Sequence, residues 1–107
     1  MAVLGMFVTA PANAQTFAQK HPRRAEVLRR DNRQTGKNNA ALRSGKISRG
    51  QDRKLNREDR SIKRQEQRDA RRNGGHITKG EQRKLNREEN KVNRQRRADV
   101  RADKTNH

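Results

Sequence analysis

Two segments of this chain repeat one another at an offset of 30 residues, and this repeat restricts the fold more than any other feature. Residues 45–65 read GKISRGQDRKLNREDRSIKRQ, and residues 75–95 read GHITKGEQRKLNREENKVNRQ, with 11 of the 21 positions identical. Residues 15–35 hardly match either copy, and we interpret them as part of a divergent leading helix. The repeat therefore predicts the same local structure twice, preceded by a third segment that differs from it.

Each copy opens with the signals of a helix start. Ser48 and Gln51 in the first copy, and Thr78 and Glu81 in the second, have the spacing of a capping box. In this motif the hydroxyl accepts a hydrogen bond from the third amide of the helix, and the Gln or Glu side chain accepts one from the cap residue. Glycines stand before both caps, where they suit the left-handed end of a preceding helix.

These signals predict an all-α fold of three helices joined by two short glycine-containing turns. The helices are expected within residues 23–43, 49–72 and 79–101. Only ten large aliphatic side chains follow residue 14. Burial of these few apolar groups offsets only a small part of the conformational entropy that is lost on folding. We therefore expect marginal stability and partly disordered termini.

A helical wheel sorts the charges of the second and third helices. At about 100° per residue, Leu55 and Ile62 fall on the same side as the carboxylates of the second helix, and Leu85 and Val92 do so in the third. The arginines gather on the opposite side, except Arg96, which falls among the carboxylates. We predict that these opposite sides, called the arginine faces below, bind polyanions. They comprise Arg53, Arg57, Arg60, Arg64, Arg68, Arg71, Arg83, Arg87, Arg94, Arg97 and Arg101.

The chain is strongly basic. It holds 29 Lys and Arg against 12 Asp and Glu, which gives a formal net charge of +17, and 20 of the cations are arginines. Such a charge attracts nucleic acid, anionic lipid or lipopolysaccharide, acidic polysaccharide or acidic protein, and arginine binds phosphate or carboxylate through a bidentate fork. The alternative interpretation is a solubilising outer face, with the carboxylates meeting basic residues of the first helix.

The first residues have the pattern of an export signal. Residues 1–14 read MAVLGMFVTAPANA, a short apolar run that ends in a small-x-small cleavage pattern at Ala12 and Ala14. Because the usual basic start is missing, we interpret residues 1–14 as a truncated signal peptide and residues 15–107 as the mature basic helical region. The run is too short to span a bilayer. The sequence therefore predicts a periplasmic or secreted protein whose mature chain has no transmembrane segment.

Groups that carry chemistry are sparse in this sequence. Cys, Tyr and Trp are absent, which excludes disulfides and thiolate sites and disfavours single-strand binding on aromatic platforms. His21, His76 and His107 are too dispersed along the chain to predict a metal site. No nucleophile-base arrangement, phosphate loop or metalloprotease motif is present. We therefore predict no catalytic residue, no cofactor and no bound metal.

The two turns resemble EF-hand loops. With Gly75 at loop position 6, Ile77 falls at position 8 and Glu81 at position 12, but the earlier ligand positions carry no acidic residue. The resemblance is therefore to a calcium-free, degenerate EF-hand pair. It implies that Ile47 and Ile77 pair across the two loops.

The same turns, Gly-x-Ile-Ser/Thr followed by Leu-Asn-x-Glu, also resemble those of small exported bacterial proteins to which no activity is assigned, and residues 21–27 are similar to the opening of that group. The resemblance covers most of residues 15–107 and implies helix-loop-helix repeats and export.

We therefore expect a non-enzymatic exported protein that binds an anionic surface, an acidic polysaccharide or an acidic protein through the arginine faces. The alternatives are an intracellular nucleic-acid-associated basic protein and a metal-responsive degenerate EF-hand. The sequence does not indicate an oligomeric state.

Overall fold

The structure is a computed structural model that describes residues 16–105, all but the last of them with their side chains. These residues form helices and turns and contain no strand. The helices are α2 (Phe17–Lys20), α3 (Pro22–Arg43), α4 (Arg49–Arg72) and α5 (Lys79–Thr105). The expected signal peptide, residues 1–14, lies outside the described residues. The all-α prediction is confirmed.

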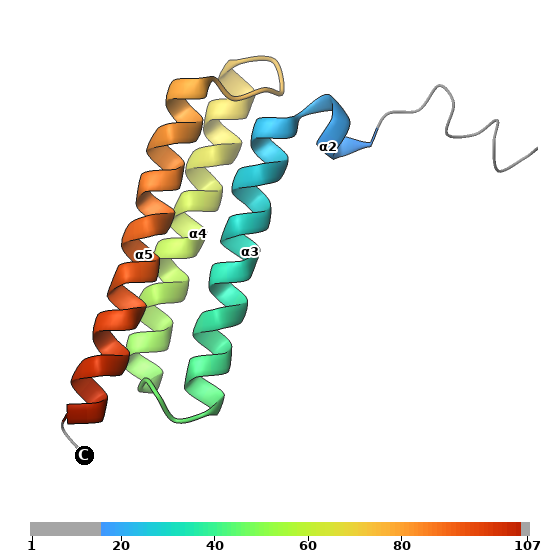
Figure 1. Cartoon of the computed structure of the whole chain (residues 1–107). Coiled ribbons are helices and arrows are strands. Elements are labelled where there is room, and N and C mark those ends of the chain that lie inside the picture. The colour runs from blue at the N-terminus through green and yellow to red at the C-terminus, as the bar shows by residue number, and fades with distance from the viewer. Residues whose placement is uncertain (1–15, 106–107) are drawn as a thin grey trace, which may run out of the picture.

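Helices α3, α4 and α5 lie side by side as an antiparallel bundle, and each of them contacts the other two (Figure 1). The α3–α4 turn therefore lies at one end of the bundle and the α4–α5 turn at the other. The expected bounds of 49–72 agree with α4, whereas α5 continues four residues beyond the expected end at 101.

The expectation of three helices is wrong because the sequence signals missed α2. This helix is a single turn, too short to show a helical period, and it begins with its own capping box between Thr16 and Gln19. Pro22 separates it from α3, since proline favours the first position of a helix and turns the preceding residue away from helical geometry. His21 accordingly has φ −133° and ψ 66°.

The two repeats begin with the same cap, as their sequences predict. Ser48 Oγ accepts a hydrogen bond from Gln51 N at 3.1 Å, and Thr78 Oγ1 accepts one from Glu81 N at 3.1 Å. The return bonds are formed as well, because Ser48 N donates to Gln51 Oε1 and Thr78 N donates to Glu81 Oε1, both at 2.8 Å. Within the described chain, positive φ angles occur only in the turns ahead of these caps, and all of them belong to glycines.

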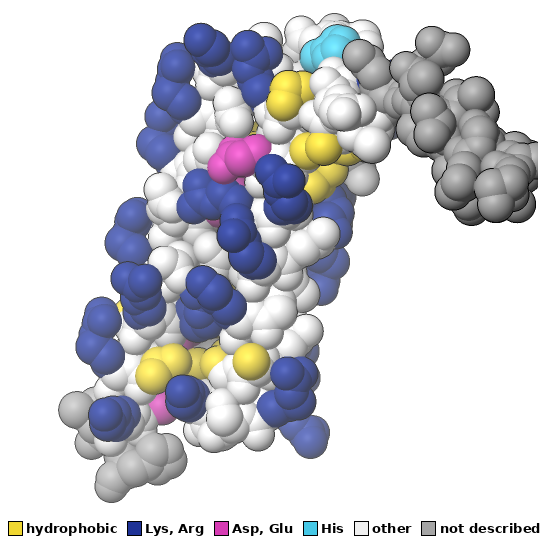
Figure 2. Space-filling model, turned by 45° about the vertical axis from the view of Figure 1, so that its right-hand side comes forward, with side chains coloured by type: hydrophobic (Ala, Val, Ile, Leu, Met, Phe, Trp, Pro, Cys, Tyr) yellow, Lys and Arg dark blue, Asp and Glu magenta, His cyan; other side chains and the backbone are white. Residues whose placement is uncertain are grey.

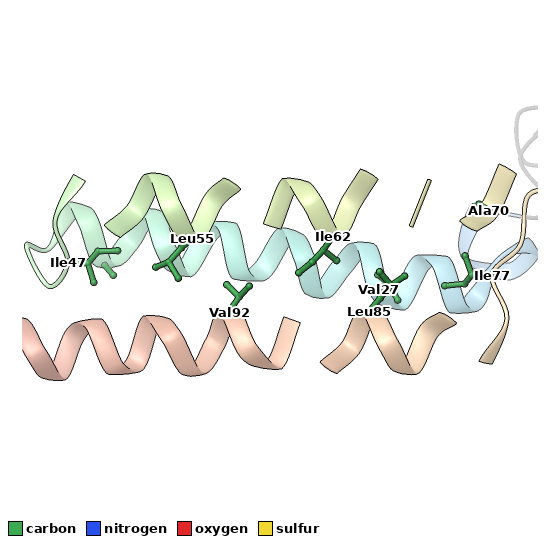
Figure 3. Close-up of a cluster of buried hydrophobic side chains, with 9 residues drawn as sticks. Val27, Ile47, Leu55, Ile62, Ala70, Ile77, Leu85 and Val92 are labelled. Atoms are coloured by element: carbon green, nitrogen blue, oxygen red, sulfur yellow. The ribbon is translucent and has the colours of Figure 1, made fainter. Parts of the chain in front are cut away.

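One apolar cluster runs along the axis of the bundle (Figure 3). It consists of Val27, Ala41, Ile47, Leu55, Ile62, Ala70, Ile77, Leu85 and Val92. Seven of the ten large aliphatic side chains counted in the sequence belong to this cluster. The other three, Leu28, Leu42 and Val100, are half-buried. The sparse apolar groups are therefore concentrated in one column, which leaves much of the helix–helix contact to polar side chains.

The expected pairing of Ile47 with Ile77 is wrong. Figure 3 places the two side chains at opposite ends of the apolar cluster. The reason is the continuous helix α4, whose 24 residues span about 36 Å at 1.5 Å per residue and hold the two turns apart.

Candidate polyanion-binding surface

The carboxylates of this protein face the inside of the bundle. The buried ones are Asp31, Asp52, Asp59, Glu66, Asp69 and Glu89. The other six Asp and Glu residues are half-buried, so none of the twelve is exposed. The helical wheel is confirmed on this point, because the buried carboxylates of α4 share its inner side with Leu55 and Ile62.

The cations lie on the outside. Five of the 29 are not exposed, namely Arg23, Arg24, Arg30 and Lys63, which are half-buried, and Arg96, which is buried. The other 24 are exposed. Figure 2 shows Lys and Arg side chains distributed along the whole height of the bundle, with little acidic surface between them. The fold therefore separates charge radially, with carboxylates inside and cations outside.

All eleven residues of the arginine faces are exposed. Apart from Arg101, none of them forms a hydrogen bond or ion pair with another side chain of residues 16–104. The phase predicted for these arginines is confirmed, and the binding role assigned to them stays a prediction.

Two grooves bring parts of the arginine faces together with other cations. Arg68 and Arg71 of α4 lie with Lys84 of α5 along a groove of about 540 Å³. At the opposite end, Arg97 and Arg101 of α5 line a groove of about 460 Å³ together with lysines of α3 and the α3–α4 turn. The arginine faces therefore do not form a single strip but meet different neighbours at the two ends of the bundle.

The leading helix neutralises part of the interior. Arg24 of α3 forms a two-pronged ion pair with Glu66 of α4, in which Nη2 donates to Oε1 at 3.2 Å and Nε donates to Oε2. Arg30 of α3 lies 3.8 Å from Glu89 of α5. The carboxylates thus meet basic residues of the first long helix, as the alternative interpretation of the sequence proposed.

Arg96 is the exception among the arginines of α5. Its guanidinium is buried and donates from Nη1 to Gln34 Oε1 at 2.6 Å and to Asn38 Oδ1 at 3.1 Å, and from Nη2 to Asn93 Oδ1. Asn38 in turn donates to Asp59 Oδ2 at 2.9 Å. The helical wheel places Arg96 on the inner side but does not reveal this network, because Gln34 and Asn38 come from α3 and Asp59 comes from α4.

Three carboxylates lie at the centre of the bundle, and we call Asp31, Asp59 and Glu89 the inner carboxylates. Burial is the main cause that raises the pKa of Asp31 to about 6, that of Asp59 to about 7 and that of Glu89 to about 8. Repulsion by Asp31 also raises the pKa of the other two. One oxygen of each aspartate and both oxygens of Glu89 accept no hydrogen bond from the described residues. The interior therefore carries less negative charge near neutral pH than its composition suggests.

The carboxylate of Glu81, the last position of the EF-hand resemblance, caps α5. It accepts hydrogen bonds from Thr78 N and from Asn73 Nδ2, at 2.8 and 2.9 Å. These bonds, that from the Thr78 backbone first, lower the pKa of Glu81. Gln51 occupies the same position in the first copy and makes the same bond to the backbone of its cap residue.

Two histidines that are far apart in the sequence meet in the fold. His21 Nδ1 and His76 Nδ1 are 3.2 Å apart, although 55 positions separate the residues. The fold therefore brings together two histidines that are dispersed along the sequence, and His107 lies outside the described residues. No sequence signal reveals the contact, since it depends on how α3 is placed against the α4–α5 turn.

None of the helices in residues 16–105 combines the length and apolar character that crossing a bilayer requires. Comparisons with protein-family models, curated proteins and solved structures found no match to this chain. A function for this protein therefore has to be argued from its own surface and interior.

Proposed function

We propose that this protein is an exported, non-enzymatic interaction protein that binds an anionic surface or an acidic polysaccharide or protein through its arginine faces. One observation carries the proposal. Twenty-four of the 29 cations are exposed, whereas none of the 12 carboxylates is. An approaching anion therefore meets exposed positive groups on every helix, whereas the acidic side chains are half-buried or buried.

The buried ion pairs strengthen this asymmetry. The carboxylates that could neutralise the outer arginines are held inside by Arg24, Arg30 and the amides around Arg96. The positive potential of the surface consequently extends into solvent, where it raises the local concentration of anions and the rate of encounter. Because arginine donates to phosphate, sulfate or carboxylate oxygens in a bidentate manner, the arginine faces supply directional bonds in addition to charge.

The interior supports a binding role rather than a catalytic one. Shifted pKa values often mark active sites, and the carboxylates with raised pKa values here are Asp31, Asp59 and Glu89. These side chains are at most 2% exposed, so a substrate in solvent does not reach them. They serve the packing of the bundle.

The first test is the salt dependence of binding to heparin, duplex DNA and anionic vesicles, measured by calorimetry. If about six anionic groups are contacted, the affinity should fall roughly 10³-fold between about 50 and 200 mM salt, because bound counterions are released on binding. An affinity that stays flat over this range for all three ligands contradicts the proposal.

A pair of charge-matched variants separates the arginine faces from net charge. The test variant replaces four arginines of α4 by glutamine: Arg57, Arg60, Arg64 and Arg68. The control replaces four exposed cations of α2 and α3 by glutamine: Lys20, Arg29, Arg33 and Arg43. The proposal predicts a much larger loss of affinity in the test variant. Equal losses would mean that binding follows overall charge and that the arginine faces have no special part.

The compartment decides between the exported protein and the intracellular nucleic-acid alternative. The N-terminus of protein isolated from its host should start at Gln15 if residues 1–14 are a signal peptide. An unprocessed N-terminus, together with tighter binding to nucleic acid than to heparin, would favour the alternative.

A calcium titration followed by circular dichroism addresses the metal-responsive EF-hand alternative, which unchanged helicity would exclude.

A further inference from the structure

One end of the bundle holds an imidazole pair that the polyanion proposal does not use. His21, between α2 and α3, and His76, in the α4–α5 turn, have their Nδ1 atoms 3.2 Å apart and their ring centroids 4.6 Å apart. Flanking bonds hold the two segments together. Arg23 Nη1 donates to the carbonyl of Ile77 at 3.2 Å, and Arg24 Nη1 donates to that of Gly75 at 3.4 Å. Figure 2 shows histidine atoms at the surface of this end.

We propose that His21 and His76 form a site for one divalent transition-metal ion, copper(II) or zinc(II). A metal–nitrogen bond of about 2.0–2.1 Å places two nitrogens on the same ion roughly 2.9–3.4 Å apart, for angles between square-planar and tetrahedral. The observed separation of 3.2 Å falls inside this range. Imidazole nitrogen suits zinc and copper, whereas calcium and magnesium require oxygen ligands.

The surroundings of His21 favour the neutral form of its ring. Desolvation, followed by the neighbouring His76, Arg24 and Lys20, lowers the pKa of His21, and Glu66 opposes them. A neutral ring at neutral pH is the form that binds metal. The positive charge of Arg24 is offset by its ion pair with Glu66, which reduces the repulsion that an incoming cation would meet.

The protein supplies two ligands rather than a complete cage. Within residues 16–104, no group of three or more His, Cys, Asp or Glu side chains is placed to hold a metal ion. Water would complete the coordination shell, which makes the site open and exchangeable. Bound metal would link residues 21 and 76 and so tie the α2–α3 junction to the α4–α5 turn, and the folded state would gain stability with the logarithm of the metal concentration once this exceeds the dissociation constant.

The repeat provides an independent argument. The two turns share Gly-x-Ile at residues 45–47 and 75–77, but the middle position is Lys46 in the first and His76 in the second. The turn itself therefore does not require histidine. The imidazole occurs only in the copy that lies against His21, and the first copy shows that lysine is accepted at this position without loss of the turn.

Calorimetric titration of the full chain with copper(II) or zinc(II) chloride at neutral pH tests the site. We expect one ion per chain, with copper(II) bound more tightly than zinc(II) and no response to calcium. His76→Lys restores the residue of the first turn, and His21→Asn removes a side chain that makes no capping bond to α3. Each should weaken binding by more than about tenfold, while circular dichroism shows the helices intact.

His107→Asn is the matched control, because it removes the third imidazole of the chain and should leave the affinity unchanged. Binding should also weaken as the pH falls, because protons compete with the metal ion for the imidazole nitrogens. A chain that binds neither ion overturns the proposal. So does binding that survives His76→Lys or His21→Asn, or that is lost in His107→Asn, since each result would place the metal elsewhere. Heparin binding by these three variants should remain as in the parent chain.

Discussion

The inner and outer sides of the bundle treat the same kinds of side chain in opposite ways. Asp59 and Arg60 are neighbours in α4, yet the aspartate is 1% exposed and the arginine is in solvent. Arg96 and Arg97 are neighbours of identical type in α5, and the first is buried among amides while the second is exposed to solvent. The position of a charged residue around its helix therefore decides whether its side chain is buried or exposed.

Charged groups on the inner and outer sides also contribute differently to stability and to binding. A buried charge has lost its hydration and depends on the partners that replace it, so removing one partner is costly. An exposed charge keeps its water and contributes little to stability, whatever it contributes to binding. Substitutions inside the bundle should consequently act on folding, and substitutions outside it should act on ligand affinity.

The largest expected effect is at Arg96. Replacing Arg96 by Ala leaves Gln34, Asn38 and, through Asn38, Asp59 without their cationic partner inside the bundle. We expect the free energy of unfolding to fall by about 3 kcal/mol, measured by urea denaturation followed by circular dichroism. The adjacent Arg97→Ala is the control and should change it by no more than about 0.5 kcal/mol. Equal effects at the two positions would remove the distinction between inner and outer charges.

The next effect is a loss of stability as the pH rises. The pKa values of Asp59 and Glu89 are about 7 and about 8 in the folded protein, above the ordinary values of 3.8 and 4.5. At a pH between the ordinary pKa and the raised pKa of such a group, the folded state binds more protons than the unfolded state. The free energy of unfolding must therefore decrease as the pH increases through this range. At about 1.4 kcal/mol per proton and pH unit, we expect a loss of about 3 kcal/mol between pH 6.5 and 8.5.

This pH range lies above the ordinary pKa of histidine, so the carboxylates dominate the change. The groups that face them from the three helices are Glu26, Arg30, Lys63 and Arg96. Asp59→Asn keeps the shape of the side chain and cannot ionise, so it should flatten the pH dependence and raise the stability at pH 8.5. A parent chain whose stability stays constant from pH 6.5 to 8.5 would show that the inner carboxylates are ionised throughout.

The caps fix the helical phase that separates the two sides, and their loss should have a smaller effect. Thr78→Ala removes the hydroxyl that accepts from Glu81 N, and Ser48→Ala removes the one that accepts from Gln51 N. Each substitution should lower the free energy of unfolding by about 1 kcal/mol in the same denaturation experiment. Because the two copies form the same bonds, strongly unequal losses would mean that only one turn governs the bundle.

The sequence is sufficient to predict what depends on one helix at a time. The capping boxes at Ser48 and Thr78 locate the starts of α4 and α5, and the phase from Leu55 and Leu85 places the carboxylates inside and the arginines outside. These features follow from hydrogen bonds three residues apart and from the period of 3.6 residues, which are local properties of the chain.

What the sequence does not predict depends on α3. The contacts of Arg24 with Glu66, of Arg96 with Gln34 and of His21 with His76 each join α3, or the residue just before it, to a partner 42 to 62 positions away. The leading helix is not part of the repeat, so no internal comparison shows which of its residues face inward. The raised pKa values of the inner carboxylates share this origin, because their burial is complete only once α3 covers them.

The smallest expected effect is at Arg64, and its sign is opposite to that at Arg96. Arg64 lies between Arg60 and Arg68 at a spacing of four residues on the exposed side of α4, where like charges repel. Arg64→Gln relieves this repulsion, so we expect the free energy of unfolding to rise by about 0.5 kcal/mol at low ionic strength. The gain should disappear in high salt, where the charges are screened. A clear loss of stability at low salt would instead mean that Arg64 helps to hold the bundle together. It would contradict the division between an inner side that stabilises the fold and an outer side that is free to bind a ligand.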